Sequence, residues 1–174
     1  MKKYLFVALS ILAGLITVLY FNEFVQGIVA SAILQTGVSF SFRGIILTAF
    51  IPFIGTNSFF TYCFLLLLPL LLSGIFIELS AVSLKKIINL NLRTGVIIFQ
   101  LINMGYIVVN IFAAILSVLL KNSSESGWSR LFVFSSIAYE KQLIIMFLLL
   151  LLSLAYINYS TKRLKNYITI IKEK

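Results

Sequence analysis

Four long apolar runs restrict the fold of this chain more than any other feature. They cover residues 4–21, 59–80, 95–120 and 143–159. A helix needs about 20 apolar residues to cross the ~30 Å hydrocarbon core of a bilayer. Charged residues make up only 11% of the chain, which is too few to coat a soluble globule of this size. We therefore predict an all-α integral membrane protein, with about four transmembrane helices in one membrane domain.

The basic residues lie at the ends of the apolar runs, as on the cytoplasmic flanks of membrane helices. With both chain ends inside, ten of them are cytoplasmic: Lys2, Lys3, Lys85, Lys86, Arg93, Lys162, Arg163, Lys165, Lys172 and Lys174. The four left outside are Arg43, Lys121, Arg130 and Lys141. This excess predicts cytoplasmic termini, a basic tail over 161–174 and an external loop over 121–142. We attribute the net charge of +9 to this topology and not to binding of nucleic acid.

The segment over 22–57 separates the first two apolar runs. A helical pattern continues over 24–34. One unbroken rod over 4–36 would be about 50 Å long at ~1.5 Å per residue, which exceeds the thickness of the hydrocarbon core. We therefore expect a break near Asn22 or Gly37.

After this break the residues alternate with the period of a strand. Val38, Phe40 and Phe42 are apolar, and the residues between them are polar. The sequence therefore predicts a re-entrant segment or a short β-hairpin within 22–57. Non-helical backbone at membrane depth must be covered by protein or face a wet cavity.

Several kinds of chemistry are excluded by the amino acids that are missing. The chain has no His and no Asp, and Cys63 is its only cysteine. A histidine-ligated metal, a histidine general base and a Ser-His-Asp triad are therefore excluded. A single cysteine provides neither an internal disulfide nor a cysteine zinc site.

The first candidate for a functional role is Glu23, in the N-E-x-x-Q sequence that begins at Asn22 and ends at Gln26. A carboxylate beside an apolar span is costly and indicates function by default. The alternative is an interfacial Glu in the first turn of a helix that Asn22 caps. Arg43 is the expected ion partner, because a hairpin would fold back over the helix.

A polar stripe in the third apolar run is the second candidate. On a helical wheel of about 100° per residue, four residues share one face: Gln100, Asn103, Asn110 and Ser117. Such side chains in membrane helices usually form hydrogen bonds to other helices. The alternative is that the stripe faces Glu23 across a former active site.

Residues 20–56 resemble the small bacterial zincin membrane peptidases, distant relatives of the site-2-type intramembrane metalloproteases. The family pattern runs H-E-x-x-H-G, then a V-x-F-x-F-x-G strand, then an apolar span with a proline. Here the matching segments are N-E-F-V-Q-G over 22–27, V-S-F-S-F-R-G over 38–44 and L-P-L over 68–70. A later span of such families supplies a third ligand, commonly Asp, and Asn110 occupies a similar place.

The resemblance implies a peptidase fold with degenerate active-site positions. Asn22, Gln26 and Asn110 stand where the family has His, His and Asp, and only Glu23 is retained. Neutral amide oxygens are poor zinc ligands beside imidazole and carboxylate. Without a metal, nothing lowers the pKa of a water or polarises a peptide carbonyl. We therefore expect no metal, no cofactor and no catalysis at these positions.

Three functional hypotheses follow. The first is a metal-free pseudopeptidase in a bacterial inner membrane, a scaffold that binds another membrane protein against the strand edge over 38–42. The second is a small accessory or substrate-binding subunit of a transporter or other membrane complex, with the stripe from Gln100 to Ser117 facing a neighbour. The third is an enzyme that uses Glu23 as a base by an unfamiliar route.

Overall fold

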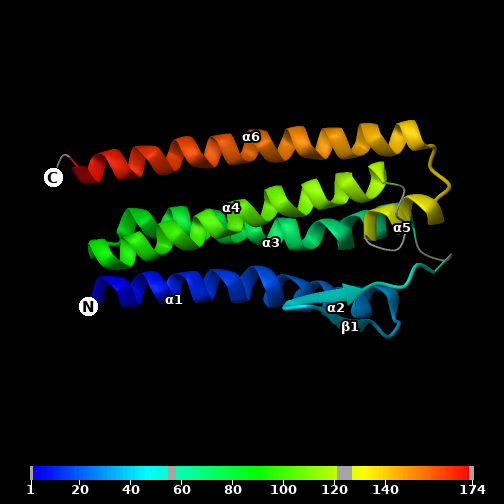
Figure 1. Ribbon diagram of the computed structural model, residues 1–174, viewed down its shortest axis with the longest axis horizontal. Coiled ribbons are helices and arrows are strands. Elements are labelled where there is room, and N and C mark those ends of the chain that lie inside the picture. The colour runs from blue at the N-terminus through cyan, green and yellow to red at the C-terminus, as the bar shows by residue number, and fades with distance from the viewer. Residues whose placement is uncertain (1, 55–57, 121–126, 173–174) are drawn as a thin grey trace.

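The chain forms a bundle of long helices that lie side by side along one axis (Figure 1). This computed structural model describes residues 2–54, 58–120 and 127–172. Four helical stretches are long and apolar enough to cross a membrane: Tyr4–Leu34, Phe59–Lys86, Leu90–Leu119 and Tyr139–Ile168. The predicted set of four long apolar helices with one small hairpin is therefore present. The first helix begins, and the last helix ends, at the same end of the bundle (Figure 1).

The first rod is continuous through Asn22 and ends near Gly37, the second of the two positions at which a break is expected. It comprises α1 (Lys2–Ile16), a π-helical segment η1 (Thr17–Phe21) and α2 (Asn22–Leu34). The helix therefore runs well beyond the predicted span over 4–21, and it ends where Gln35 adopts a left-handed conformation, with φ of 52°. Short π segments mark irregular points within α-helices and often lie at functional sites. Here η1 lies directly before the N-E-x-x-Q segment.

The predicted hairpin lies on this rod. Strand β1 (Ser39–Arg43) pairs antiparallel with β2 (Ile46–Phe50), and Arg43 lies opposite Ile46 across a two-residue loop. Gly44, the first loop residue, has φ of +63°, as type II′ hairpin turns require at that position. The non-helical part of 22–57 therefore begins after Leu34, which agrees with the helical pattern expected over 24–34.

The middle of the bundle is an antiparallel helix pair. α3 (Phe59–Lys86) and α4 (Leu90–Leu119) extend past the predicted spans, which end at residue 80 and begin at residue 95. Side chains satisfy the first backbone donors of both helices: Ser58 Oγ accepts from Thr61 N at 3.2 Å, and Asn89 Oδ1 accepts from Asn91 N at 3.0 Å. Such caps stabilise a helix start by about 1 kcal/mol.

Two further helices complete the described chain. α5 (Gly127–Phe134) lies within the predicted external loop, of which residues 121–126 are outside the described residues. Trp128, Leu131 and Phe132 bury their side chains against α3 and α4, so α5 is part of the core. α6 (Tyr139–Lys172) is longer than the predicted span over 143–159 and continues as helix into the basic tail.

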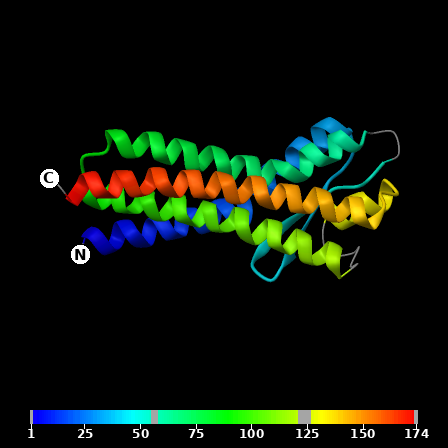
Figure 2. The same cartoon turned by 90° about the horizontal axis from the view of Figure 1, so that it is seen from above.

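The rod changes neighbours along its length. α1 packs against α4, whereas α2 crosses over to pack against α3 (Figure 2). Gly95 of α4 permits the close approach of α1, because a β-carbon at Gly95 would collide with Ser10 Oγ. By contrast, a β-carbon at Gly105 of the same helix would meet nothing within 4 Å.

We expect the Gly95→Leu substitution to lower stability by about 1–3 kcal/mol, because overpacking forces α1 away from α4. Gly105→Leu is the matched control, since it places the same side chain on the same helix in open space. Thermal unfolding of the detergent-solubilised proteins measures the difference. Equal midpoints for the two variants would contradict the close packing of α1 on α4.

Candidate functional site

The N-E-x-x-Q segment lies where the first rod meets α3, and its two amides bond to that helix. Asn22 is completely buried, and its Nδ2 donates a hydrogen bond to Ser73 Oγ at 2.8 Å. Gln26 is 5% exposed, and its Nε2 donates to the backbone carbonyl of Leu65 at 2.7 Å. Asn22 is not a helix cap, because its own backbone is helical, with φ of −60° and ψ of −44°. Both side chains therefore join two membrane helices.

Pro69 explains why the carbonyl of Leu65 accepts a bond from another helix. In an α-helix, the carbonyl of residue 65 accepts from the N–H of residue 69, and proline has no N–H. Pro69 lies inside α3 and is buried. An unpaired carbonyl in apolar surroundings costs about 1–3 kcal/mol. Gln26 supplies the missing donor.

Asn22 and Gln26 form hydrogen bonds to α3 on both sides of Pro69. They lie one turn apart on α2, and their partners Leu65 and Ser73 lie four residues before and four residues after Pro69 on α3. The two helices are therefore fixed in register at the irregular point of α3. We call the pair of hydrogen bonds from Asn22 and Gln26 to α3 the amide clamp.

Glu23 points to a different element. Its Oε2 accepts a hydrogen bond from the backbone N–H of Ala49 in β2 at 3.0 Å. The side chain of Arg43, the expected ion partner, lies outside the described residues. The described role of this carboxylate is therefore to hold the edge of β2 against the rod.

A glycine lets the hairpin lie close to α2. A β-carbon at Gly27 would collide with the ring of Phe40. The same ring lies 5.8 Å from that of Phe24, and the ring of Phe42 lies 6.5 Å from that of Tyr20. β1 therefore rests on the rod through its aromatic side chains, while Glu23 holds β2.

The register of the hairpin determines which backbone groups point outward. After a two-residue loop, hydrogen-bonded and non-hydrogen-bonded pairs alternate, beginning with the hydrogen-bonded pair beside the loop. Phe42–Leu47 and Phe40–Ala49 are therefore the non-hydrogen-bonded pairs. Their N–H and C=O groups point away from the partner strand.

The two outer edges of the hairpin differ in their partners. On β2 the outward N–H of Ala49 donates a hydrogen bond to Glu23. On β1 the outward groups of Phe40 and Phe42 form no hydrogen bond within the described part of the chain. The edge of β1 is thus available to another strand.

Asn110 approaches Glu23 through an intermediate residue. Asn110 Nδ2 donates to the phenol oxygen of Tyr106 at 3.1 Å. The Tyr106 phenol is close enough to Glu23 for an electrostatic interaction between them. The structure therefore brings Glu23 and Asn110 to one region, but Asn22 and Gln26 direct their amides to α3 instead.

Most of the polar stripe on α4 faces the interior of the chain. Gln100 and Asn103 are 1% and 0% exposed, and Ser117 is buried as well. Asn103 Nδ2 donates to its own backbone at Phe99, and the Ser117 hydroxyl lies 2.9 Å from that of Ser129 in α5. Within the described residues, only this last bond joins the stripe to another helix.

Three residues that sequence reasoning missed complete the site: Ser73, Ala49 and Tyr106. Tyr106 has a sequence signal, because it precedes Asn110 by four residues and shares its helix face. Pro69 is a second signal, since a proline inside a helix predicts a free carbonyl at residue 65. Nothing in the sequence pairs Ala49 with Glu23, because that bond uses a backbone group.

The chemistry of this arrangement is that of hydrogen bonding between elements. Within the described residues, no three His, Cys, Asp or Glu side chains gather where they would hold a metal ion. Asn22, Glu23 and Gln26 each have a partner in the protein. Together they fasten α3 and the hairpin to neighbouring faces of α2.

Comparison with models of known protein families, with curated protein sequences and with solved structures finds no match for this chain.

We expect Gln26→Leu to destabilise the protein by about 1–3 kcal/mol, because it leaves the carbonyl of Leu65 unpaired. In a Pro69→Ala background the same substitution should cost much less, since the introduced alanine restores the N–H that this carbonyl lacks. Unfolding of the four proteins of this double-mutant cycle in detergent measures the coupling. Equal costs in both backgrounds would show that Gln26 and Pro69 are not linked through Leu65.

Proposed function

We propose that this protein is a non-catalytic subunit of a membrane complex, and that it binds an extended segment of another membrane protein along the outer edge of β1. The observation that carries the proposal is the asymmetry of the hairpin. Glu23 takes the outward N–H of Ala49 on β2, whereas the outward groups of β1 have no partner among the described residues. An exposed strand edge binds extended peptides through main-chain hydrogen bonds.

The depth of the hairpin supports this proposal. Phe42 lies beside Tyr20, which is 16 residues after Tyr4 and therefore about 24 Å along the rod at ~1.5 Å per residue. With Tyr4 at one membrane surface, the loop of the hairpin lies inside the ~30 Å hydrocarbon core. The hairpin is then re-entrant, and lipid cannot satisfy its open edge.

The side chains around the loop fit the same position. Phe42 is 68% exposed and Ile45 is 71% exposed, and both are apolar. These side chains suit contact with lipid, but the backbone groups beside them do not, because an unpaired backbone group in hydrocarbon costs several kcal/mol. A strand from a partner protein removes that cost.

The partners of the N-E-x-x-Q segment support a role without catalysis. In the proposed metal-free pseudopeptidase, Asn22 and Gln26 stand at the positions of metal ligands but form the amide clamp instead. Glu23 stands at the position of a catalytic base but anchors the hairpin. The site is then a scaffold that presents the strand edge. In this interpretation the chain is a relative of the bacterial membrane zinc peptidases.

A transporter accessory subunit has less support. That hypothesis needs the polar stripe of α4 on the surface, where it meets a neighbouring subunit or a ligand. Gln100, Asn103 and Ser117 are buried within the chain instead.

We further propose a bacterial cytoplasmic membrane with both termini inside. The four apolar helices and the common end of the first and last helices support an even number of crossings (Figure 1). Lys85, Lys86 and Arg93 lie near that end, as the positive-inside rule requires.

We expect green fluorescent protein fused after the last residue to fluoresce, and alkaline phosphatase fused at the same point to remain inactive. Both reporters distinguish the two sides of the bacterial membrane. The opposite pattern would reverse the proposed orientation.

The strand-edge proposal predicts opposite outcomes for two proline substitutions. Phe42→Pro removes an outward N–H from the open edge of β1, whereas Leu47→Pro removes the outward N–H of its pair on β2. Proline is tolerated at strand edges, where its missing N–H is not part of the ladder. Membranes are cross-linked in cells, and the co-purified membrane proteins are quantified by mass spectrometry.

We expect Phe42→Pro to lose a stoichiometric partner that the wild type and Leu47→Pro both retain. Hydrogen exchange at the Phe42 amide provides a second measurement, because a bound strand protects it in the complex and not in the isolated chain. The proposal fails when both variants keep the partner, or when the Phe42 amide exchanges equally in both preparations.

A further inference from the structure

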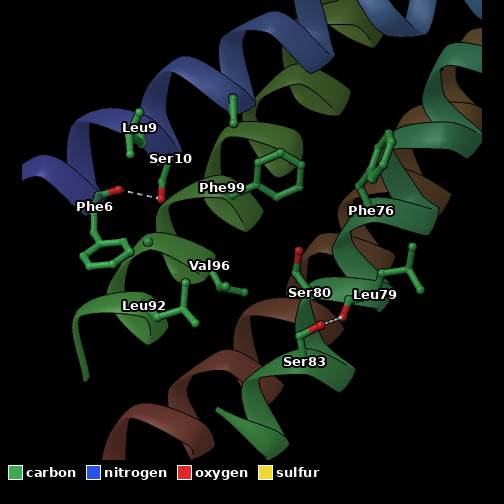
Figure 3. A pocket seen from close by; sticks show the side chains of 12 residues that line it. Phe6, Leu9, Ser10, Phe76, Leu79, Ser80, Ser83, Leu92, Val96 and Phe99 are labelled. Atoms are coloured by element: carbon green, nitrogen blue, oxygen red, sulfur yellow. Dashed lines mark hydrogen bonds between the residues drawn. The ribbon is translucent and has the colours of Figure 1, made fainter. Parts of the chain in front are cut away.

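A groove runs between α1 and α3 at the end of the bundle that holds the chain termini. Its volume is about 370 Å³, and it is open on one side. The walls are Phe6 and Leu9 of α1 and Leu79 of α3, and the floor is Val96 of α4 (Figure 3). The groove exists because α1 and α3 both pack against α4 here, whereas the rod contacts α3 farther along, through Phe21 of η1 and through α2.

The walls of the groove are largely apolar, and two of their three serines bond to their own helices. Ser10 Oγ donates to the carbonyl of Phe6 at 2.7 Å, and Ser83 Oγ donates to the carbonyl of Leu79 at 2.8 Å (Figure 3). These hydroxyls therefore use their donors on their own helices. Among the described residues, no charged side chain lines the groove. Its walls suit a hydrocarbon occupant.

One end of the groove is closed and the other is basic. The rings of Phe76 and Phe99 meet edge to face at 5.9 Å and close the inner end. At the opposite end, Lys85 and Lys86 form the last turn of α3 and are exposed. Lys86 lies seven residues after Leu79 and so continues the face of α3 that lines the groove.

Glu78, the acidic residue of α3, does not neutralise these lysines. Glu78 forms an ion pair with Arg163 of α6 at 2.9 Å and accepts from the Tyr156 hydroxyl at 3.0 Å. Its carboxylate is therefore directed to α6 and not to the groove. Arg93, in the first turn of α4, is also directed to α6, because its Nη2 donates to the carbonyl of Tyr167 at 3.4 Å.

The length of the groove matches one leaflet of a bilayer. Phe76 and Lys86 are ten residues apart on α3, which is about 15 Å at ~1.5 Å per residue. Half of the ~30 Å hydrocarbon core is also about 15 Å. A chain that begins at the lysines therefore reaches the aromatic closure near the middle of the membrane.

A single acyl chain suits a groove with apolar walls, an open side and a basic end. We propose that this groove binds one acyl chain of an anionic phospholipid, with its phosphate at Lys86. The apolar walls hold the chain, and the rings of Phe76 and Phe99 limit its depth. The basic end selects a negative headgroup over a zwitterionic one, as basic clusters at the cytoplasmic ends of membrane helices do. This proposal does not depend on the strand-edge function.

The test uses the full chain in detergent with palmitoyl-oleoyl phosphatidylglycerol or the matching phosphatidylcholine. Native mass spectrometry measures how many lipids remain bound and at what concentration. We expect one saturable phosphatidylglycerol, and weaker binding of phosphatidylcholine. Equal affinity for the two lipids in the wild type would overturn the proposed role of the basic end.

Two variant pairs distinguish binding of the lipid's acyl chain from binding of its headgroup. Val96→Trp fills the groove from its floor and should abolish saturable binding of both lipids. Val109→Trp places the same side chain on the same helix at a position that is 67% exposed, and should leave binding unchanged. Thermal unfolding confirms that both proteins are folded. Retained binding in a folded Val96→Trp protein would place the lipid elsewhere.

The charge pair is Lys86→Gln against Lys85→Gln. Both variants lower the net charge by the same amount, but only Lys86 continues the face of α3 that lines the groove, since Lys85 is on the opposite side of the helix. We expect roughly fivefold weaker binding of phosphatidylglycerol for Lys86→Gln, with binding of phosphatidylcholine unchanged. Equal losses in the two variants would show that only the overall charge matters.

Discussion

A buried carbonyl without a partner in its own helix governs how this bundle is arranged. Pro69 removes the N–H that would bind the carbonyl of Leu65, and surroundings this apolar make an unpaired acceptor costly. Gln26 supplies the donor from a different helix. The first rod must therefore lie against α3 at this level. Asn22 adds a second bond on the other side of the proline, so that the rod is fixed in register as well as in position.

The path of the first rod follows from this constraint and from one glycine. α1 begins against α4, where Gly95 permits close approach, and α2 ends against α3 at the amide clamp. Because the rod packs against α4 first and against α3 later, space is left between α1 and α3 at the N-terminal end of the rod. That space is the apolar groove. The π-helical segment η1 lies between these two parts of the rod, directly before Asn22.

The same rod is the platform for the hairpin. Gly27 gives room for the ring of Phe40, and Glu23 binds the backbone of Ala49. One outward N–H of β2 is thereby bonded within the chain, whereas the outward groups of β1 have no partner among the described residues. The strand edge and the groove lie at different levels of the bundle. We propose that a strand of a partner protein covers the first and that an acyl chain fills the second.

The sequence by itself determined the four long apolar helices and the strand period near Phe40, because these depend on local composition and spacing. It also predicted that the four polar residues of the stripe on α4 share one face. The continuation of the first helix through Asn22 was not predictable, since the partners of Asn22 and Gln26 lie 51 and 39 residues away. The bond from Glu23 to Ala49 uses a backbone group, which no residue type signals. Only the tertiary structure decided these roles, because an amide in an apolar bundle must bond to whichever donor or acceptor the packing brings within reach.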